Sequence, residues 1–298
     1  MTCYRRRMTF EGVYVPTVMP LTADHELDLD TYAKVIEFQL EAGVAGVVAN
    51  GTTGEYYALS HDERVQAMTV VRDVARGRAQ LLAGCNAGST REAAQYAETA
   101  RELGYDAIML AAPPTSLPSQ RELAAHVVAV TEAGGLPTVL YNYPARAGVE
   151  FGLESLDLLA DRSDVVAIKE SSGDFSRFLQ LRSRYEGRIQ VICGSDDQAA
   201  DYFFWGVRAW LAGTANVLPR EHVEIMVAAN KGDHEGARDG FDSILPFVQD
   251  MESGSYNQKA KLGLKHRGFD CGPVRAPLQP LDDDVAARTL AALAAALG

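Results

Sequence analysis

Residues 165–173 have the sequence V-V-A-I-K-E-S-S-G, in which four apolar residues lead directly into Lys169 and Glu170 before the chain turns. A continuous apolar run of this length is typical of a parallel strand that is buried on both faces. Similar runs recur along the chain. Together they predict strands at residues 12–20, 44–50, 80–84, 107–112, 138–143, 165–169, 189–194 and 209–213.

Amphipathic segments separate these runs and predict helices. Three of the predicted helix starts, at Ser60, Ser89 and Ser119, carry a glutamate three residues later. This spacing is the capping box, in which the two residues satisfy each other's backbone amides. The predicted helices with clear bounds lie at residues 30–41, 62–76, 90–103 and 120–133.

A regular alternation of strand and helix predicts an α/β fold, a (β/α)8 TIM barrel over residues 10–230. A doubly wound open sheet is the main alternative, but no G-x-G-x-x-G motif follows the first strand. Residues 231–298 lose the strand pattern. Predicted helices at 234–251 and 256–267, then a Gly- and Pro-bearing loop and an Ala- and Leu-rich helix, indicate a C-terminal helical appendage packed on the barrel.

Composition excludes several classes of protein. The 298 residues carry a formal net charge of −12, which argues against a nucleic-acid-binding surface. No secretory segment and no long apolar run occur, so we expect a cytoplasmic protein without a membrane span. The four cysteines, Cys3 among them, are scattered, which argues against a disulfide framework or a metal site. Met1 and Met8 are both candidate start residues, and the basic run at 5–7 lies between them.

A glycine-rich turn follows the second predicted strand, with the sequence Gly51-Thr52-Thr53-Gly54. Glycines allow positive φ angles and close approach, and successive backbone amides with two hydroxyls form a site for a small anion such as a carboxylate. By itself the same turn is also compatible with an ordinary strand-to-helix connection.

Tyr141 and Arg146 follow the fifth predicted strand. The tyrosine is a candidate proton donor or acceptor, and the arginine a candidate clamp for a carboxylate. Taken singly, each also fits a structural role, as a core tyrosine with a satisfied hydroxyl or as a surface cation.

Lys169 ends the sixth predicted strand. An amine attacks a carbonyl only when it is unprotonated, and burial at a strand end disfavours the ammonium form. Such lysines form Schiff bases. A lone lysine would more often be a solvated strand end, but active sites of TIM barrels lie at the carboxyl ends of the strands. The turn, the tyrosine and the arginine at other strand ends therefore favour a nucleophile.

These motifs resemble, in order and spacing, the dihydrodipicolinate synthase / N-acetylneuraminate lyase family. The resemblance rests on G-T-T-G-E, on Y-N-x-P-x-R and on A-I-K-E, and extends through Gly194-Ser195-Asp196 and T-A-N to the segment after Gly272. It implies a lyase in which a lysine forms a Schiff base with a small 2-oxo acid, often pyruvate. It implies no metal and no organic cofactor, and a homotetramer built as a dimer of dimers.

The resemblance also implies roles for individual residues. Lys169 would be the Schiff-base lysine, Tyr141 would move protons at the covalent intermediate, and Thr53 would belong to the proton relay. The substrate-binding residues would be Thr52, Gly51, Gly54, Arg146, Gly194 and Leu211.

Two positions conflict over the substrate. Where the synthases carry a tyrosine pair, this chain has Pro114 and Thr115, and a threonine lacks the reach and acidity of a phenol. Arg146 instead resembles the synthases. We therefore expect aldolase, dehydratase or deaminase chemistry on a pyruvate-related or hydroxylated 2-oxo acid. The first alternative is 4-hydroxy-tetrahydrodipicolinate synthase, which condenses pyruvate with aspartate semialdehyde. The second is a noncatalytic module that binds a 2-oxo acid.

Overall fold

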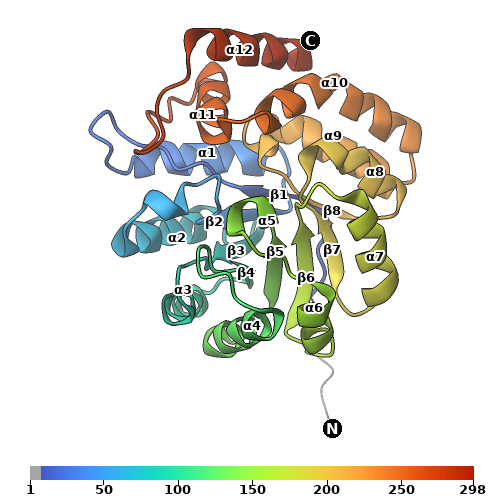
Figure 1. Ribbon diagram of the computed structural model, residues 1–298. Helices are drawn as coiled ribbons and strands as arrows, with labels where there is room; N and C mark the ends of the chain where they lie inside the picture. The colour runs from blue at the N-terminus through green and yellow to red at the C-terminus, as the bar shows by residue number, and fades with distance from the viewer. Residues whose placement is uncertain (1–7) are drawn as a thin grey trace. The chain divides into compact units, whose positions relative to one another are not determined.

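The computed structural model describes residues 8–298, so that Cys3 and the basic run at 5–7 lie outside the described residues. Eight strands follow one another in a closed barrel, with helices between them (Figure 1). The predicted fold class, a (β/α)8 barrel with C-terminal helices, is confirmed. The strands are β1 (Gly12–Pro16), β2 (Gly46–Ala49), β3 (Gln80–Gly84), β4 (Ala107–Ala111), β5 (Thr138–Asn142), β6 (Val165–Glu170), β7 (Gln190–Cys193) and β8 (Ala209–Leu211).

Several strands end earlier than the apolar runs predict. The prediction for the first strand extends to residue 20, whereas β1 ends at Pro16. Val18 and Met19 are nevertheless buried, and the amide of Val18 donates to the Asn216 side chain at 2.9 Å rather than to a strand. An apolar run therefore continues into a buried loop, which hydrophobicity alone does not separate from a strand.

Twelve α-helices lie within residues 8–298, together with short 3-10 segments such as Tyr56–Ala58 and Asp196–Gln198. The α-helices are α1 (Leu29–Glu41), α2 (His61–Ala75), α3 (Thr90–Leu103), α4 (Gln120–Gly134), α5 (Pro144–Ala147), α6 (Leu153–Leu159), α7 (Phe175–Tyr185), α8 (Ala199–Phe204), α9 (Pro219–Asn230), α10 (His234–Glu252), α11 (Tyr256–His266) and α12 (Asp283–Leu297).

The predicted capping boxes form at two of their three positions. Ser60 and Ser119 each exchange hydrogen bonds with the glutamate three residues later, at the starts of α2 and α4. At α3, Ser89 accepts from the amide of Glu92, which is half of the box. The sequence spacing thus places all three helix starts correctly.

The chain divides into two compact units. The first contains residues 84–192. In it β5 pairs in parallel with both β4 and β6, while α4 packs against α3 and α6. Every residue of β5 and β6 is buried, as expected for parallel strands covered on both faces.

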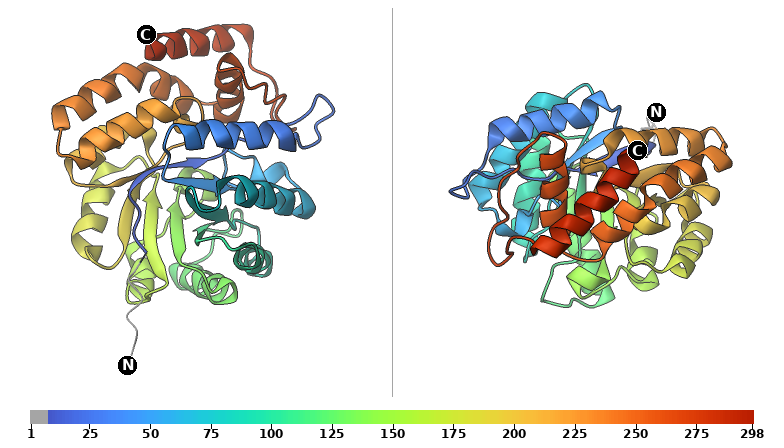
Figure 2. Two further views of the ribbon diagram at one scale, coloured as in Figure 1. Left: turned by 180° about the vertical axis from the view of Figure 1, so that it is seen from behind. Right: turned by 90° about the horizontal axis from the view of Figure 1, so that it is seen from above.

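The second unit contains residues 12–83 and 193–298. In it β1 pairs in parallel with β2 and β8, and α9 packs against β1 and α10. The last helix, α12, lies against α10 and α11, as both views in Figure 2 show. The boundary near residue 230 stays a prediction.

One buried carboxylate joins the three C-terminal helices. Asp250 of α10 accepts from Thr289 Oγ1 at 2.6 Å and from Arg288 Nε at 3.0 Å, both on α12. Lys259 Nζ of α11 lies 3.3 Å from the same carboxylate. Because this lysine is 1% exposed, its pairing fixes α11 against α10. Across residues 8–298, none of the helices has the length and apolarity that a membrane span requires.

Candidate active site

The two predicted catalytic residues of the first unit lie side by side. Tyr141 of β5 is directly opposite Lys169 of β6 in the parallel register. Each is 7% exposed, and Lys169 Nζ lies 4.4 Å from the centre of the Tyr141 ring. The sequence placed each residue at a strand end, and the register brings the amine and the phenol together. A buried amine can form a covalent bond with a carbonyl group, and the hydroxyl of a neighbouring phenol can donate and accept the protons that this reaction requires.

The residues that follow this pair hold the two strand ends together. Asn142 Nδ2 donates to both carboxylate oxygens of Glu170, each at 3.0 Å. Arg177 of α7 donates through Nε to Glu170 at 3.1 Å, and the amide of Ser172 donates at 2.8 Å. Side chains alternate along a strand, so Glu170 points to the opposite face from Lys169. It therefore fixes the strand on which the lysine stands.

We predict that Arg177→Met lowers the free energy of unfolding by about 3–5 kcal/mol, because it leaves the carboxylate of Glu170 buried without its cation. The two side chains are 8% and 0% exposed. The matched control is Arg184→Met, whose ion pair with Asp157 at 2.6 Å is about half exposed, so that its loss should lower the free energy of unfolding much less. Denaturant unfolding of both variants checks the difference, and equal losses would contradict it.

A second tyrosine extends the site beyond the predicted residues. The Tyr143 ring centre lies 6.0 Å from that of Tyr141, and the Arg146 guanidinium lies 5.4 Å from the centre of the Tyr143 ring. Arg146 is exposed on the short helix α5, which begins with Pro144. Tyr143 was not among the predicted site residues; it follows the last residue of β5, Asn142, and immediately precedes α5.

The loop that contains Pro114 and Thr115 is partly open to solvent. Thr115 is exposed and has a φ of 74°, and Leu117 is 60% exposed with a φ of 46°. The Leu117 side chain lies near Gly148, where an added Cβ would come within 2.8 Å of it. This loop therefore approaches the end of α5, which carries Arg146.

In the second unit, the predicted anion-binding turn forms two overlapping bonds. The Gly54 amide donates to Gly51 O at 3.1 Å, and the Glu55 amide donates to Thr52 O at 3.0 Å. Thr53 is 8% exposed and Thr52 is half-buried. Residues 51–55 therefore form a tight backbone turn that carries both threonines, and its role in anion binding stays a prediction.

Gly51 and Gly54 are required for close approach of the backbone and not, as predicted, for positive φ angles. Positive φ angles occur at Asn50 (54°) and Glu55 (55°), and not at Gly51 or Gly54. A Cβ on Gly54 would meet Thr17 O at 2.8 Å, and one on Gly51 would meet Pro16 at 3.0 Å. Close approach to β1 and the loop after it therefore requires the glycines.

A buried aspartate that the prediction omitted, Asp196, lies two residues after Gly194 and accepts from Trp210, the residue before Leu211. Leu211 of β8 is fully buried, and Gly194 is half-buried just after β7. Asp196, 2% exposed, accepts from Trp210 Nε1 at 2.9 Å, from Thr214 Oγ1 at 2.9 Å and from the Tyr256 hydroxyl at 3.1 Å. The carboxylate therefore joins the chain after β7 to that after β8. Its only sequence signal was its position in the quoted Gly-Ser-Asp stretch.

A histidine completes this network. His222 of α9 is fully buried, and its Nε2 lies 2.7 Å from Thr214 Oγ1. Burial lowers the pKa of His222 to about 4, so that the imidazole is neutral at neutral pH. A neutral ring can exchange a hydrogen bond with a hydroxyl without introducing a second buried charge, which indicates a structural role for this group.

Comparison with known proteins gives a consistent result. The model of the dihydrodipicolinate synthetase family matches residues 9–296. The 4-hydroxy-tetrahydrodipicolinate synthase of Exiguobacterium sp. is 33% identical over 95% of this chain and 97% of its own length. That of Methanocaldococcus jannaschii is 33% identical over 92% of this chain and 94% of its own.

A solved structure agrees with these relatives. The chloride-inhibited dihydrodipicolinate synthase from Acinetobacter baumannii, complexed with pyruvate, has a TM-score of 0.90 and 31% identity, covering 97% of this chain and 99% of its own. The match extends over nearly the whole chain in sequence and in fold. The chain therefore belongs to the dihydrodipicolinate synthase family and is a lyase of the Schiff-base-forming type that this family comprises.

Proposed function

We propose that Lys169 forms a Schiff base with the C2 carbonyl of a small 2-oxo acid. The observation that carries the proposal is the position of its amine, 4.4 Å from the ring centre of Tyr141 on the neighbouring strand. Family membership supports the same assignment. The neutral amine adds to C2, the resulting carbinolamine loses water, and an iminium remains.

The iminium determines what the enzyme can do next. It withdraws electrons from C2, so that loss of a proton from C3 gives an enamine. The enamine can attack an electrophile, and in the reverse direction a bond from C3 is broken with the electron pair passing to the iminium. Tyr141 would carry protons to and from the carbinolamine, with Thr53 as the expected next member of the relay.

The remaining residues are assigned to substrate binding. Gly51, Thr52, Thr53 and Gly54 would hold the carboxylate that every 2-oxo acid carries. Gly194 and Leu211 would line the pocket. Pyruvate is the first candidate, because a relative with 31% identity has been solved in complex with it.

The second substrate separates two versions of this function. Pro114 and Thr115, neither of which supplies a phenol, favour a distinct 2-oxo acid reaction, such as a 2-keto-3-deoxy sugar acid aldolase or dehydratase, a 4-hydroxy-2-oxoglutarate aldolase or a deaminase of a hydroxylated pyrroline carboxylate. The alternative is condensation of pyruvate with aspartate semialdehyde, which Arg146 and the names of the relatives favour.

A substrate screen tests these versions directly. Candidate 2-oxo acids are supplied singly, and pyruvate is supplied with and without aspartate semialdehyde. Release of pyruvate from a hydroxylated 2-oxo acid supports the first version. Consumption of pyruvate only when the semialdehyde is present identifies the second, and no turnover of any 2-oxo acid overturns the proposal.

Arg146→Ala is expected to raise KM by about 10-fold or more for substrates with a distal carboxylate, while KM for a neutral-tailed substrate changes little. An exposed arginine is positioned to form a charge-assisted bond with a carboxylate that enters from solvent. Steady-state kinetics with a matched pair of substrates measures this. Equal changes for both substrates would contradict the clamp.

We also propose a homotetramer in the cytoplasm, from the family resemblance. Light scattering on the purified chain, with an expected mass of four times 32.2 kDa, checks the assembly.

A further inference from the structure

Glu55, the residue after the predicted anion-binding turn, is buried against the C-terminal part of the chain. Its side chain is 2% exposed, and its Oε1 lies 2.8 Å from Nζ of Lys261 on α11, which is 4% exposed. The other carboxylate oxygen accepts from the backbone amide of Arg275 at 3.1 Å. One carboxylate oxygen of Glu55 is therefore in an ion pair and the other in a hydrogen bond.

Lys261 is itself held in place. Its amine also donates to Pro273 O at 2.5 Å, so that one ammonium joins the turn to the loop after α11. Burial lowers the pKa of Lys261, while the nearby Glu55 carboxylate opposes that shift. Burial of two opposite charges costs desolvation free energy, which their attraction offsets only when they lie close together with good geometry, so their separation is well defined.

Further contacts from the same C-terminal segment surround the turn. Asn257 of α11 donates through Nδ2 to Thr52 O at 3.3 Å and to the Tyr57 hydroxyl at 3.1 Å. The Arg275 guanidinium donates to Ala58 O at 2.9 Å and to Glu63 at 2.8 Å. The turn and the residues after it are thus held at several points by residues 257–275.

These observations lead to a positioning role. We propose that Lys261 and Glu55 are positioning residues for the carboxylate-binding turn, and that α11 sets the geometry with which this turn binds the substrate. The inference rests on the proposed function of residues 51–54. Neither side chain touches the substrate. They act through the backbone of Gly54 and Thr52, because Glu55 follows Gly54 in the chain and its backbone amide donates a hydrogen bond to Thr52 O.

The expected effect follows from geometry. Amide and hydroxyl donors bind a carboxylate well only within a narrow range of distances, and a displacement of about 1 Å can cost about 100-fold in kcat/KM. Loss of the pair frees Glu55, which sits at a φ of 55° that a residue other than glycine rarely adopts. The turn then relaxes away from its binding geometry. The affinity for the 2-oxo acid therefore falls more than the rate of the chemical steps that follow binding.

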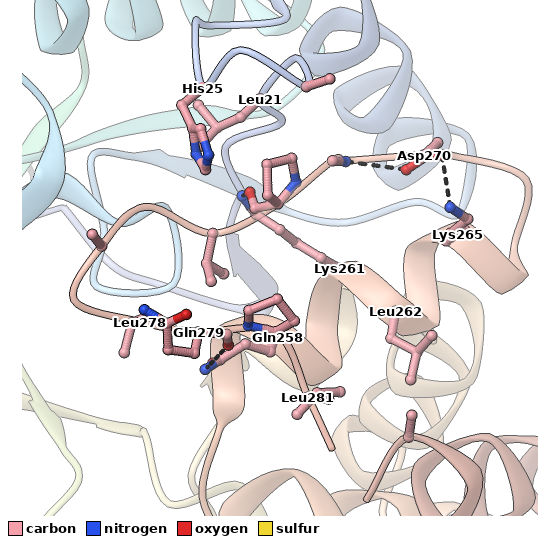
Figure 3. A pocket seen from close by; sticks show the side chains of 17 residues that line it. Leu21, His25, Gln258, Lys261, Leu262, Lys265, Asp270, Leu278, Gln279 and Leu281 are labelled. Atoms are coloured by element: carbon pink, nitrogen blue, oxygen red, sulfur yellow. Dashed lines mark hydrogen bonds and ion pairs between the residues drawn. The ribbon is translucent and has the colours of Figure 1, made fainter. Parts of the chain in front are cut away.

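The surroundings of Lys261 make it a suitable position to change. Lys261 lines a cavity of about 820 Å³, together with Leu262, Leu278 and Leu281 (Figure 3). Methionine fills less space than lysine and retains an apolar stem, so Lys261→Met introduces no overpacking beside this cavity. Lys265 stands one turn later on α11, and its amine pairs with Asp270 at 2.9 Å.

Lys265→Met is the matched control. It is the same substitution on the same helix, but its ion pair is exposed, at 63% and 65%. Exposed pairs contribute little to stability. This control therefore removes a lysine and an ion pair without disturbing the turn.

The experiment measures adduct formation with borohydride at increasing concentrations of pyruvate. It also measures kcat at saturation and the midpoint of unfolding. For Lys261→Met we expect the half-saturating pyruvate concentration to rise about 10- to 100-fold, with kcat at saturation changed much less. Lys265→Met should behave like the unaltered chain. Glu55→Gln keeps the side-chain shape and loses the charge, and it should likewise raise the half-saturating concentration more than it changes kcat. It tests the proposal even if Lys261→Met fails to fold.

The double variant Glu55→Gln with Lys261→Met should be more stable than Lys261→Met alone, since it removes the buried carboxylate without a partner. Its half-saturating concentration should remain high. A lowered unfolding midpoint with unchanged half-saturation in Lys261→Met and Glu55→Gln would overturn the positioning role. If the unaltered chain forms no adduct with pyruvate or another 2-oxo acid, the proposed function itself fails, which is a separate outcome.

Discussion

Lys169→Ala should abolish adduct formation and lower kcat on the order of 10⁴- to 10⁶-fold, the scale seen when a covalent nucleophile is removed. The reason is that no other group in the first unit's site, Tyr141 included, can form the iminium. Alanine also removes a side chain that is 7% exposed next to the Tyr141 ring. Turnover of the screened substrate and mass analysis after borohydride treatment measure the two effects.

Lys231→Ala is the control for this prediction. Lys231 is exposed at the end of α9, so its loss should change neither turnover nor the adduct. An adduct of unchanged yield in Lys169→Ala would assign the chemistry to another lysine. The pair of variants therefore separates a general loss of lysine from loss of this amine.

Tyr141→Phe should lower kcat by about 10²- to 10⁴-fold, the usual contribution of a positioned acid–base group. Phenylalanine keeps the ring against which Lys169 Nζ lies at 4.4 Å, so the lysine should stay in place and still form the adduct. The hydroxyl alone is removed. Stopped-flow or rapid-quench kinetics would separate slow proton transfer from weak binding.

Tyr185→Phe provides the comparison. The Tyr185 hydroxyl donates to Leu153 O at 3.2 Å and to Asp157 at 2.9 Å, at contacts that belong to helices α6 and α7. Its removal should lower stability by about 1 kcal/mol, the net worth of a typical hydrogen bond, with kcat preserved. A kcat in Tyr141→Phe equal to that of Tyr185→Phe would remove Tyr141 from the mechanism.

The fold could be predicted because its signal is local. Continuous apolar runs separated by capped helices require nothing beyond short stretches of sequence. The errors arose where a loop is as buried as a strand: Val18 and Met19 are apolar and inaccessible, yet they lie beyond the end of β1 at Pro16. A buried loop and a buried strand therefore have the same apolar composition, and composition alone does not separate them.

The candidate site was predictable only in part. Lys169 and Tyr141 stand at the ends of recognisable strands, and the parallel register then makes them neighbours. The supporting residues give no such signal. Glu55 and Arg275 are 220 residues apart in the chain, and no local pattern in either segment indicates that they meet. Asp196 was visible as an acidic residue after a strand, but its five-fold engagement depends on groups from β8, the loop after it and α11.

The central claim is that Lys169 is the covalent nucleophile. Incubation of the full chain with pyruvate and borohydride, followed by intact mass and peptide mapping, tests it most directly. We expect a single reduced pyruvyl adduct per chain, on the peptide that contains Lys169 and absent from Lys169→Ala. An adduct on a different lysine, or none with any 2-oxo acid, would contradict it.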